Sequence, residues 1–224
     1  FINNNLFNVT SDLGYFWGGF GNGPWLINNG TFNLASGTDF TLSTVNFTNN
    51  GAFNITSGSL TMGGGSGGCV GVHNGSFNLD ATSFLYASAG AFYLNGSLTA
   101  PTANSVQFNG MTSYINTTNI ATPALLETAG TVFQSANVVV PAYNIAAGTI
   151  WPTLPAAFNT LNLTNAELRG ANVIITNFVS GDSTTSFPTR PRGTTIQEAD
   201  SWPQTRNDRG RTTVVHPHRV DVGR

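Results

Sequence analysis

Pairs of apolar residues separated by one polar residue run through most of this chain. Between residues 28 and 62 the pairs are Phe32/Leu34, Phe40/Leu42, Val45/Phe47 and Phe53/Ile55. A spacing of two places both side chains on one face of a β-strand. Because Gly, Ser, Asn, Asp or Thr bounds each pair after a few residues, the pattern predicts an all-β protein of many short strands.

The same phrase also returns at a fixed interval. Asn28-Asn29-Gly30-Thr31-Phe32-Asn33-Leu34 is repeated 21 residues later as Asn49-Asn50-Gly51-Ala52-Phe53-Asn54-Ile55. Three strands in a period of this length describe a coil with three sides, and such coils bury their apolar edges by stacking in parallel. The repeat therefore predicts a parallel β-helix, a three-sided β-solenoid whose equivalent inward residues form columns.

Further copies extend this pattern toward the C-terminus. They are Gly75-Ser76-Phe77-Asn78-Leu79 and Gly90-Ala91-Phe92-Tyr93-Leu94, with weaker echoes at Ser105-Val106-Gln107-Phe108 and Gly130-Thr131-Val132-Phe133. Residues 161–178 predict one more coil, with Leu161, Leu163, Leu168, Val173, Ile175 and Phe178 pointing inward. Val138-Val139-Val140 predicts a strand that ends at Pro141. An antiparallel sandwich also has short strands, but it gives no reason for identical side chains to recur every 21 residues.

Three regions follow from this pattern. Residues 1–27 are rich in aromatic residues and Gly and predict an N-terminal strand and cap region. Residues 28–182 hold the solenoid, and residues 183–224 have no period, four Pro and most of the charge. The last region predicts an irregular or disordered tail.

The repeat resembles the right-handed parallel β-helix group, which has the pectin-lyase-like architecture. The Gly-x-Phe-x-Leu/Ile units and residues 161–178 carry the likeness, which is closer to the Gly-, Asn- and Thr-rich adhesin and cell-surface members. Polysaccharide lyases of this group use clustered acidic calcium ligands with a basic residue. Because residues 1–182 contain only Arg169 against six scattered acidic residues, the resemblance does not extend to that activity.

Charged residues make up only 8% of the chain, and there is no Lys. This polar, uncharged composition favours a secreted or cell-surface β-rich protein over a disordered one. The solenoid region has no basic stripe for nucleic acid and no run of 18 apolar residues for a membrane span. The opening has no signal-peptide pattern, which indicates either a removed signal or a piece of a longer protein. Cys69 is the only Cys, and we expect it to be a small buried residue.

Eight Asn-x-Ser/Thr sequences are candidate N-glycosylation sites. They begin at Asn8, Asn29, Asn46, Asn54, Asn74, Asn95, Asn116 and Asn162. Asn29, Asn74 and Asn95 precede Gly and predict exposed turns, whereas Asn54 lies within a predicted strand. The alternative is that these residues build turns and stacked amide ladders.

Candidate chemistry is sparse. Tyr15, Trp17 and Trp25 are candidate contacts for a carbohydrate or a protein partner, although the same aromatic residues would also serve as a cap that seals the solenoid end. Asp39 and Asp80 do not occupy matching repeat positions, so they make a poor catalytic pair. His73 precedes an Asn-Gly turn and is expected to be exposed. His216 and His218 lack further zinc ligands, and Gly63–Gly68 is expected to be a flexible turn.

The sequence therefore favours a non-catalytic structural or adhesive module of a secreted or cell-surface protein. No catalytic residue, cofactor or metal is expected. The alternative is a carbohydrate-binding or carbohydrate-active β-helix. An ice-binding solenoid would need Thr in register before each Phe, and that row reads Thr31, Ala52, Ser76 and Ala91. The expected partners are carbohydrate or other surface proteins, and unpaired strand edges at the solenoid ends predict end-to-end self-association.

Overall fold

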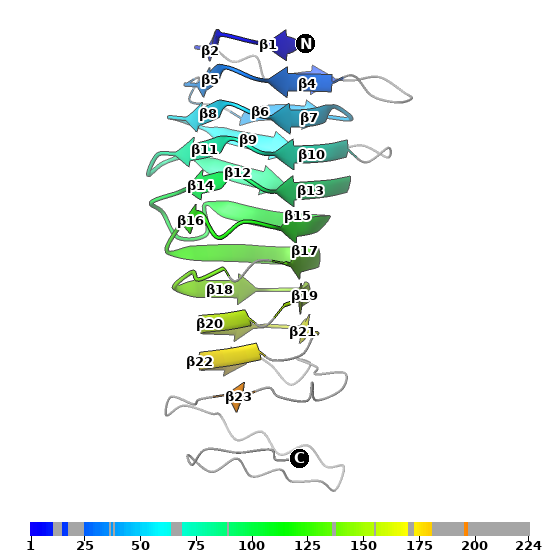
Figure 1. The fold of residues 1–224 in the computed structure, drawn as a ribbon, viewed down its shortest axis with the longest axis vertical. Helices are drawn as coiled ribbons and strands as arrows, with labels where there is room; N and C mark the ends of the chain where they lie inside the picture. The colour runs from blue at the N-terminus through cyan, green and yellow to red at the C-terminus, as the bar shows by residue number, and fades with distance from the viewer. Residues whose placement is uncertain are drawn as a thin grey trace, which may run out of the picture.

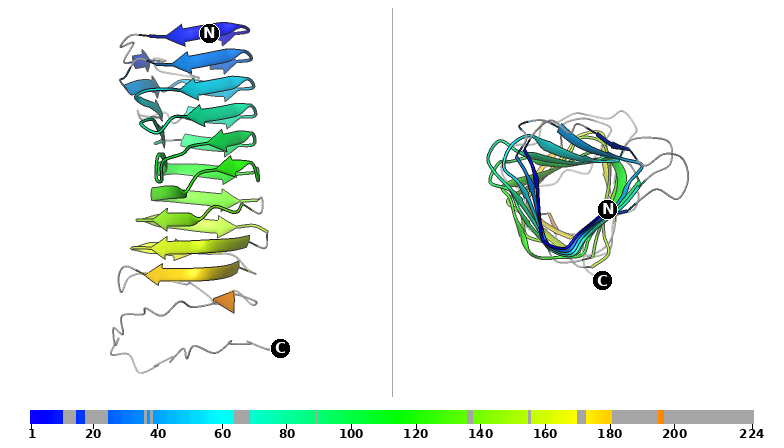
Figure 2. Two further views of the ribbon diagram at one scale, coloured as in Figure 1. Left: turned by 90° about the vertical axis from the view of Figure 1, so that its left-hand side faces the viewer. Right: turned by 90° about the horizontal axis from the view of Figure 1, so that it is seen from above.

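Stacked parallel coils form a β-solenoid with a roughly triangular cross-section (Figures 1 and 2). The computed structural model describes residues 1–10, 15–17, 25–35, 37, 39–63, 69–88, 90–135, 138–154, 156–169, 173–180 and 195–196. Every strand pairing among them is parallel, and strands from one coil pair with strands of the next. The predicted all-β parallel β-helix is therefore confirmed.

The first side of the solenoid consists of short strands that end at the corner leading to the second side. They are β1 (Ile2–Asn3), β4 (Trp25–Asn28), β7 (Asn46–Asn49), β10 (Cys69–His73), β13 (Gly90–Leu94), β19 (Gly148–Pro152) and β21 (Ala166–Leu168). The second side begins with a six-stranded sheet of β2 (Leu6–Val9), β5 (Thr31–Leu34), β8 (Ala52–Ile55), β11 (Ser76–Leu79), β14 (Ser97–Thr99) and β16 (Ile120–Ala121).

The third side contains β3 (Tyr15–Trp17), β6 (Asp39–Ser43), β9 (Ser59–Met62), β12 (Phe84–Ala87) and β18 (Ala142–Ile145). Longer strands turn the corners of the later coils. β15 (Val106–Ile115) and β17 (Ala124–Gln134) run from the third side to the first, and β20 (Ala156–Leu163) and β22 (Val173–Ser180) run from the second side to the third. The short β23 (Thr195–Ile196) pairs with β22.

The core consists of columns of equivalent side chains. Phe32 and Phe53 stack with ring centroids 4.4 Å apart, and Phe77 follows at 5.4 Å from Phe53. All three rings are fully buried. The 21-residue interval is the register itself, because Phe32 pairs with Phe53 and Leu34 pairs with Ile55. Of the inward residues expected in 161–178, all but Phe178 are buried, and the Phe178 side chain lies outside what the structure describes.

Stacking begins at the first residues of the chain. β1 pairs with β4, and β2 pairs with β5, in the same register as the later coils. Phe7 therefore takes the place that Phe32 takes one coil later. Coils thus start before the residue-28 boundary that the sequence indicated, because residues 1–10 repeat the pattern with Asn5 in place of the corner Gly.

Three local interpretations of the sequence were wrong. The unit at Gly90–Leu94 lies on the first side and pairs with β10, whereas Ser97 and Leu98 take the second-side positions below Ser76 and Phe77. In the echo at Gly130, Val132 is buried and Phe133 faces outward. Residues 138–140 form no strand, although Val138 and Val140 are buried.

Candidate functional surface: asparagine ladders and an aromatic column

Asparagine side chains of successive coils pair in rows that run along the solenoid axis. In each row the Nδ2 of one Asn donates to the Oδ1 of an Asn in the adjacent coil, so an amide ladder forms. Each side chain follows its strand, and neighbouring strands lie about 4.8 Å apart, which brings consecutive carboxamides within hydrogen-bonding range. The described residues contain a corner ladder, an interior ladder, an outer ladder and a C-terminal ladder.

The corner ladder follows the turns between the first and second sides. Its members are Asn4, Asn29, Asn50, Asn74, Asn95 and Asn116, joined by amide hydrogen bonds of 2.8–2.9 Å. Most of these asparagines precede a Gly whose place is fixed by packing. A Cβ on Gly51 would lie 1.9 Å from the carbonyl oxygen of Gly30 in the preceding coil. The repeated Asn-Gly sequence is therefore a requirement of close coil stacking.

The interior ladder lies inside the solenoid and ends at His73. Asn3 donates to Asn28 and Asn28 donates to Asn49, each at 2.7 Å. Asn49 Nδ2 then lies 3.0 Å from His73 Nδ1, and His73 Nε2 lies 2.8 Å from the Ser97 carbonyl oxygen. Since the carbonyl can only accept, Nε2 carries the proton and Nδ1 accepts from Asn49.

His73 is fully buried and its ring packs on Phe77 at 4.2 Å between centroids. The prediction of an exposed histidine was wrong, because the residue before the Asn-Gly corner points inward in every coil. Burial lowers the pKa of His73 from 6.5 to about 4, although the hydrogen bond to Ser97 works in the opposite direction. This histidine is a neutral structural group, with both ring nitrogens already engaged.

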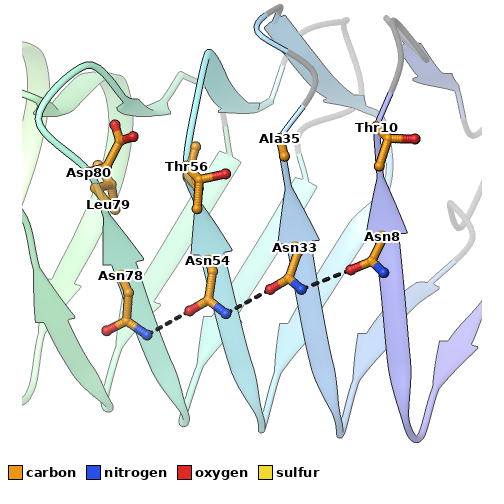
Figure 3. A pocket seen from close by; sticks show the side chains of 10 residues that line it. Asn8, Thr10, Asn33, Ala35, Asn54, Thr56, Asn78, Leu79 and Asp80 are labelled. Carbon is orange, nitrogen blue, oxygen red and sulfur yellow. Dashed lines mark hydrogen bonds between the residues drawn. The ribbon is translucent and has the colours of Figure 1, made fainter.

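The outer ladder crosses the solvent-facing surface of the second side (Figure 3). Asn33 donates to Asn8, Asn54 donates to Asn33 and Asn78 donates to Asn54, at 2.7–2.8 Å. A shallow groove of about 450 Å³ runs beside the ladder; its lining also includes Thr10, Ala35, Ile55, Thr56, Leu79 and Asp80. The groove is polar and nearly uncharged, and its length follows the solenoid axis.

Asp80 is the only ionisable residue that lines this groove. Burial works to raise the pKa of Asp80, but hydrogen bonds from Ser83 and Thr82 outweigh it and hold the pKa below its usual value. One carboxylate oxygen accepts from the Thr82 backbone N–H and from both hydroxyls. Asp80 thus stabilises its own turn as an ionised group, which does not suit a general acid.

The candidate glycosylation asparagines are mostly members of these ladders. Asn29, Asn74, Asn95 and Asn116 belong to the corner ladder, Asn8 and Asn54 to the outer ladder, and Asn162 to the C-terminal ladder of Asn104, Asn144 and Asn162. The remaining one, Asn46, accepts a hydrogen bond from the Val70 N–H through its Oδ1. The ladder role that the sequence left open is therefore real for seven of the eight.

Glycosylation stays a prediction, and the ladders restrict how it can occur. N-glycosylation substitutes Nδ2, which is the atom that donates along the ladder. Asn74, Asn95 and Asn116 occupy consecutive rungs, and a spacing of about 4.8 Å leaves no room for a sugar on each rung. Asn8 is the most compatible position, because it is exposed and its Nδ2 donates to no described residue.

An aromatic column on the first side was not predicted from the sequence. Its members are Tyr93, Tyr114, Phe133 and Trp151, and they stack in register along the axis with centroids 4.6, 5.2 and 5.5 Å apart. Arg169 covers the far face of Trp151 at 5.6 Å and pairs with Glu167 at 2.7 Å. Aromatic spacings of 21, 19 and 18 residues, close to the coil length, were the available signal.

The aromatic residues proposed as contacts lie elsewhere. Trp25 begins β4 on the first side and is 48% exposed. Tyr15 and Trp17 belong to β3 on the third side, and their side chains lie outside what the structure describes. The Cys69 side chain, residues 64–68 and His216 and His218 are likewise outside it.

The acidic side chains sit in unrelated surroundings. Asp39 accepts a 2.5 Å hydrogen bond from Ser59 on the next coil. Glu127 is fully buried, and its Oε1 accepts from the Thr149 N–H at 3.2 Å while its Oε2 has no partner among the described residues. Burial raises the pKa of Glu127 to about 9, although the hydrogen bond from Thr149 works to lower it. The carboxyl is therefore protonated at neutral pH.

No cluster of three or more His, Cys, Asp and Glu side chains that suits a metal occurs within the described part of the chain. The same part contains no helix that is long and apolar enough to cross a membrane. Comparisons with protein-family models, with curated proteins and with solved structures found no match. The functional argument therefore rests on the geometry of the solenoid itself.

Proposed function

We propose that this chain is a non-catalytic structural or adhesive module of a secreted or cell-surface protein. The observation that carries the proposal is the pairing of polar side chains along the axis. Asn28, Asn50 and Asn54 each hydrogen-bond to the preceding or following coil. Groups that would bind a ligand in an enzyme are used here to hold coil to coil, as in other stacked-strand assemblies.

The aromatic column supports the same conclusion. A sugar packs against the exposed face of an aromatic ring. Here the Tyr93 and Tyr114 rings are nearly parallel, with an angle of 4° between their planes, and each inner ring has neighbours on both faces. Only the ring edges remain for solvent, so the column adds stiffness along the axis and is a poor platform for sugars.

Mechanical measurement tests this role. We expect the solenoid, pulled through tags at residues 1 and 180, to stay at its folded length and then unfold in steps that correspond to groups of coils. An Asn50→Leu variant breaks the corner ladder and should unfold at lower force, whereas Val139→Thr, an exposed position outside the ladders, should not. Equal unfolding forces for all three proteins would contradict a mechanical role for the ladder.

A carbohydrate-binding role is the second candidate, and the groove beside the outer ladder is the observation that favours it. An uncharged groove lined by carboxamides and threonines offers hydrogen bonds to hydroxyl groups at intervals of one coil. A glycan array would test this candidate. Binding that is lost in Asn33→Leu and retained in Asn116→Leu would support it, and absence of binding to neutral oligosaccharides would leave the structural role alone.

End-to-end self-association belongs to the same proposal. Among the described residues β1 and β2 each pair on one side only, and Phe1, Ile2 and Leu6 are about half exposed beside them. Free strand edges with apolar side chains favour pairing with another chain. Light scattering should show association that weakens when Ile2 and Leu6 are both replaced by Lys. A monomer at every concentration would contradict this part.

A further inference from the structure

We propose that Asn109 is a site of spontaneous deamidation in the folded protein and that the Asn-Gly pairs of the corner ladder are protected from it. The inference concerns chemical modification of the chain and does not depend on the proposed function. Asn109 precedes Gly110 at the bend of β15, where the strand passes from the third side to the first.

Asn-Gly sequences deamidate by a defined intramolecular reaction. The backbone nitrogen of Gly loses its proton and attacks Cγ of the Asn carboxamide. The new N–Cγ bond closes a succinimide ring, and the Cγ–Nδ2 bond breaks to release ammonia. Water then opens the ring to aspartate or isoaspartate. The reaction therefore needs a Gly nitrogen that can lose its hydrogen bond and approach the side chain, and a carboxamide that is free to turn.

The corner ladder removes both conditions. Its Gly nitrogens are held by carbonyl oxygens of the preceding coil: Gly30 by Asn3, Gly51 by Asn28, Gly75 by Asn49 and Gly96 by His73, at 2.8–3.2 Å. The preceding asparagines donate through Nδ2 to the neighbouring rung. Both reacting groups are thus fixed, and the packed carbonyl beside each Gly blocks the rotation that attack requires.

Asn109-Gly110 differs at each of these points. Gly110 falls between the paired registers on both sides of β15, since pairing with β17 shifts around Asn109, and pairing with the preceding coil stops at Phe108 and resumes at Ala91↔Thr112. It is exposed at φ +88°, and a Cβ there would approach no atom nearer than 3.7 Å. The backbone at this bulge has the room that ring closure needs.

The Asn109 side chain is also oriented for reaction. Its Oδ1 accepts a 2.5 Å hydrogen bond from the Thr128 hydroxyl, while its Nδ2 donates to no described residue. A hydrogen bond to the carbonyl oxygen draws electrons from Cγ and stabilises the negative charge that develops during attack. The leaving nitrogen is therefore unrestrained, and the carbon to be attacked is activated.

Peptide mapping of the full chain, aged in its folded state at mildly alkaline pH, tests the proposal. We expect aspartate and isoaspartate at Asn109 at least about tenfold faster than at any corner-ladder asparagine that precedes Gly, because each 1.4 kcal/mol of local opening free energy slows reaction tenfold. In strong denaturant the rates of all five should converge. An Asn109→Gln variant should lose the Asn109 product while the corner-ladder rates stay unchanged.

Two results would overturn the proposal. One is deamidation of a corner-ladder asparagine at the rate of Asn109 in the folded protein, and the other is an Asn109 that reacts no faster than the ladder residues. Asn22-Gly23 lies outside the described residues. Its peptide is therefore quantified separately, so that its product is not counted as Asn109.

Discussion

The Nδ2 of Asn49 donates to Nδ1 of His73 inside the solenoid, across 3.0 Å. Protonation of His73 would place a second donor against this amide, and the other ring nitrogen already donates to Ser97. The pair therefore works only while the imidazole is neutral. Within the described residues, the ring of His73 contacts Asn49, Phe77 and the Ser97 carbonyl, and none of these groups is charged.

We predict that stability falls on acidification because of His73. The unfolded chain binds a proton below pH 6.5, whereas the folded chain resists it until about pH 4. Between these values the unfolded state is favoured, so unfolding free energy falls as pH falls, by about 1–3 kcal/mol. His73→Asn keeps an acceptor for Asn49 and a donor for Ser97. Urea unfolding across this range should show a smaller acid loss in the variant, and an unchanged loss would contradict the assignment.

Glu127 should produce the opposite dependence. Its carboxyl ionises near pH 4.5 in the unfolded chain and near pH 9 in the folded one. As pH rises through this window the unfolded state releases its proton first, so stability falls, by about 1–3 kcal/mol at neutral pH. Urea unfolding of Glu127→Gln should show a flatter alkaline side of the profile and greater stability than the wild type at pH 8.

The two groups overlap between about pH 4.5 and 6.5, where their effects partly cancel. Each single variant therefore isolates the other group. The double variant His73→Asn/Glu127→Gln should have the flattest profile of the four proteins. A double variant as steep as the wild type would show that other groups control the pH dependence.

Phe53 should be a major contributor to stability. Its ring lies between Phe32 and Phe77 with no exposed surface. Phe53→Ala should cost about 3–5 kcal/mol in chemical denaturation, because a large buried cavity remains. Phe133→Ala is the matched control in the outward aromatic column and should cost only about 1 kcal/mol. Equal losses would show that the buried column has no special weight.

The corner glycines should tolerate no side chain. Gly51→Ala forces a methyl group against the Gly30 carbonyl oxygen, so we expect a loss of more than about 3 kcal/mol or failure to fold. Gly37 has φ +75°, and no atom lies within 4 Å of the position that a methyl group would take there. Gly37→Ala should therefore cost only its backbone strain, about 1–2 kcal/mol. Thermal unfolding of both variants checks this order, and a Gly37→Ala variant that is at least as damaging would refute the close-contact argument.

Much of the fold could be predicted because local pattern and global register coincide. The inward pairs at Phe32/Leu34 and Phe40/Leu42 recur at the coil length, and the same intervals reappear as strand pairs. Prediction failed where coil length changed. Gly90–Leu94 repeats the Phe-containing phrase, but the loop before it places the phrase on the first side and not the second. A local phrase does not specify its side of the coil.

The candidate surface was less predictable. The sequence shows that Asn is abundant and that Asn-Gly recurs, and it left glycosylation and ladder formation as alternatives. Only coil stacking shows that Asn28 faces inward, that Asn29 faces the corner and that Asn33 faces solvent, each aligned with an Asn of the next coil. The burial of His73 and Glu127 was invisible for the same reason.

By itself, the sequence determined the all-β character, the three-sided coil and the columns of apolar residues, since these follow from periods of two and about 21 residues that the chain displays directly. Tertiary structure alone decided which polar residues pair, which aromatic rings stack and which ionisable groups lose water. These properties depend on neighbours about 20 residues away, brought to within about 4.8 Å by coil stacking. A change of one residue in coil length redirects a side chain from solvent to core.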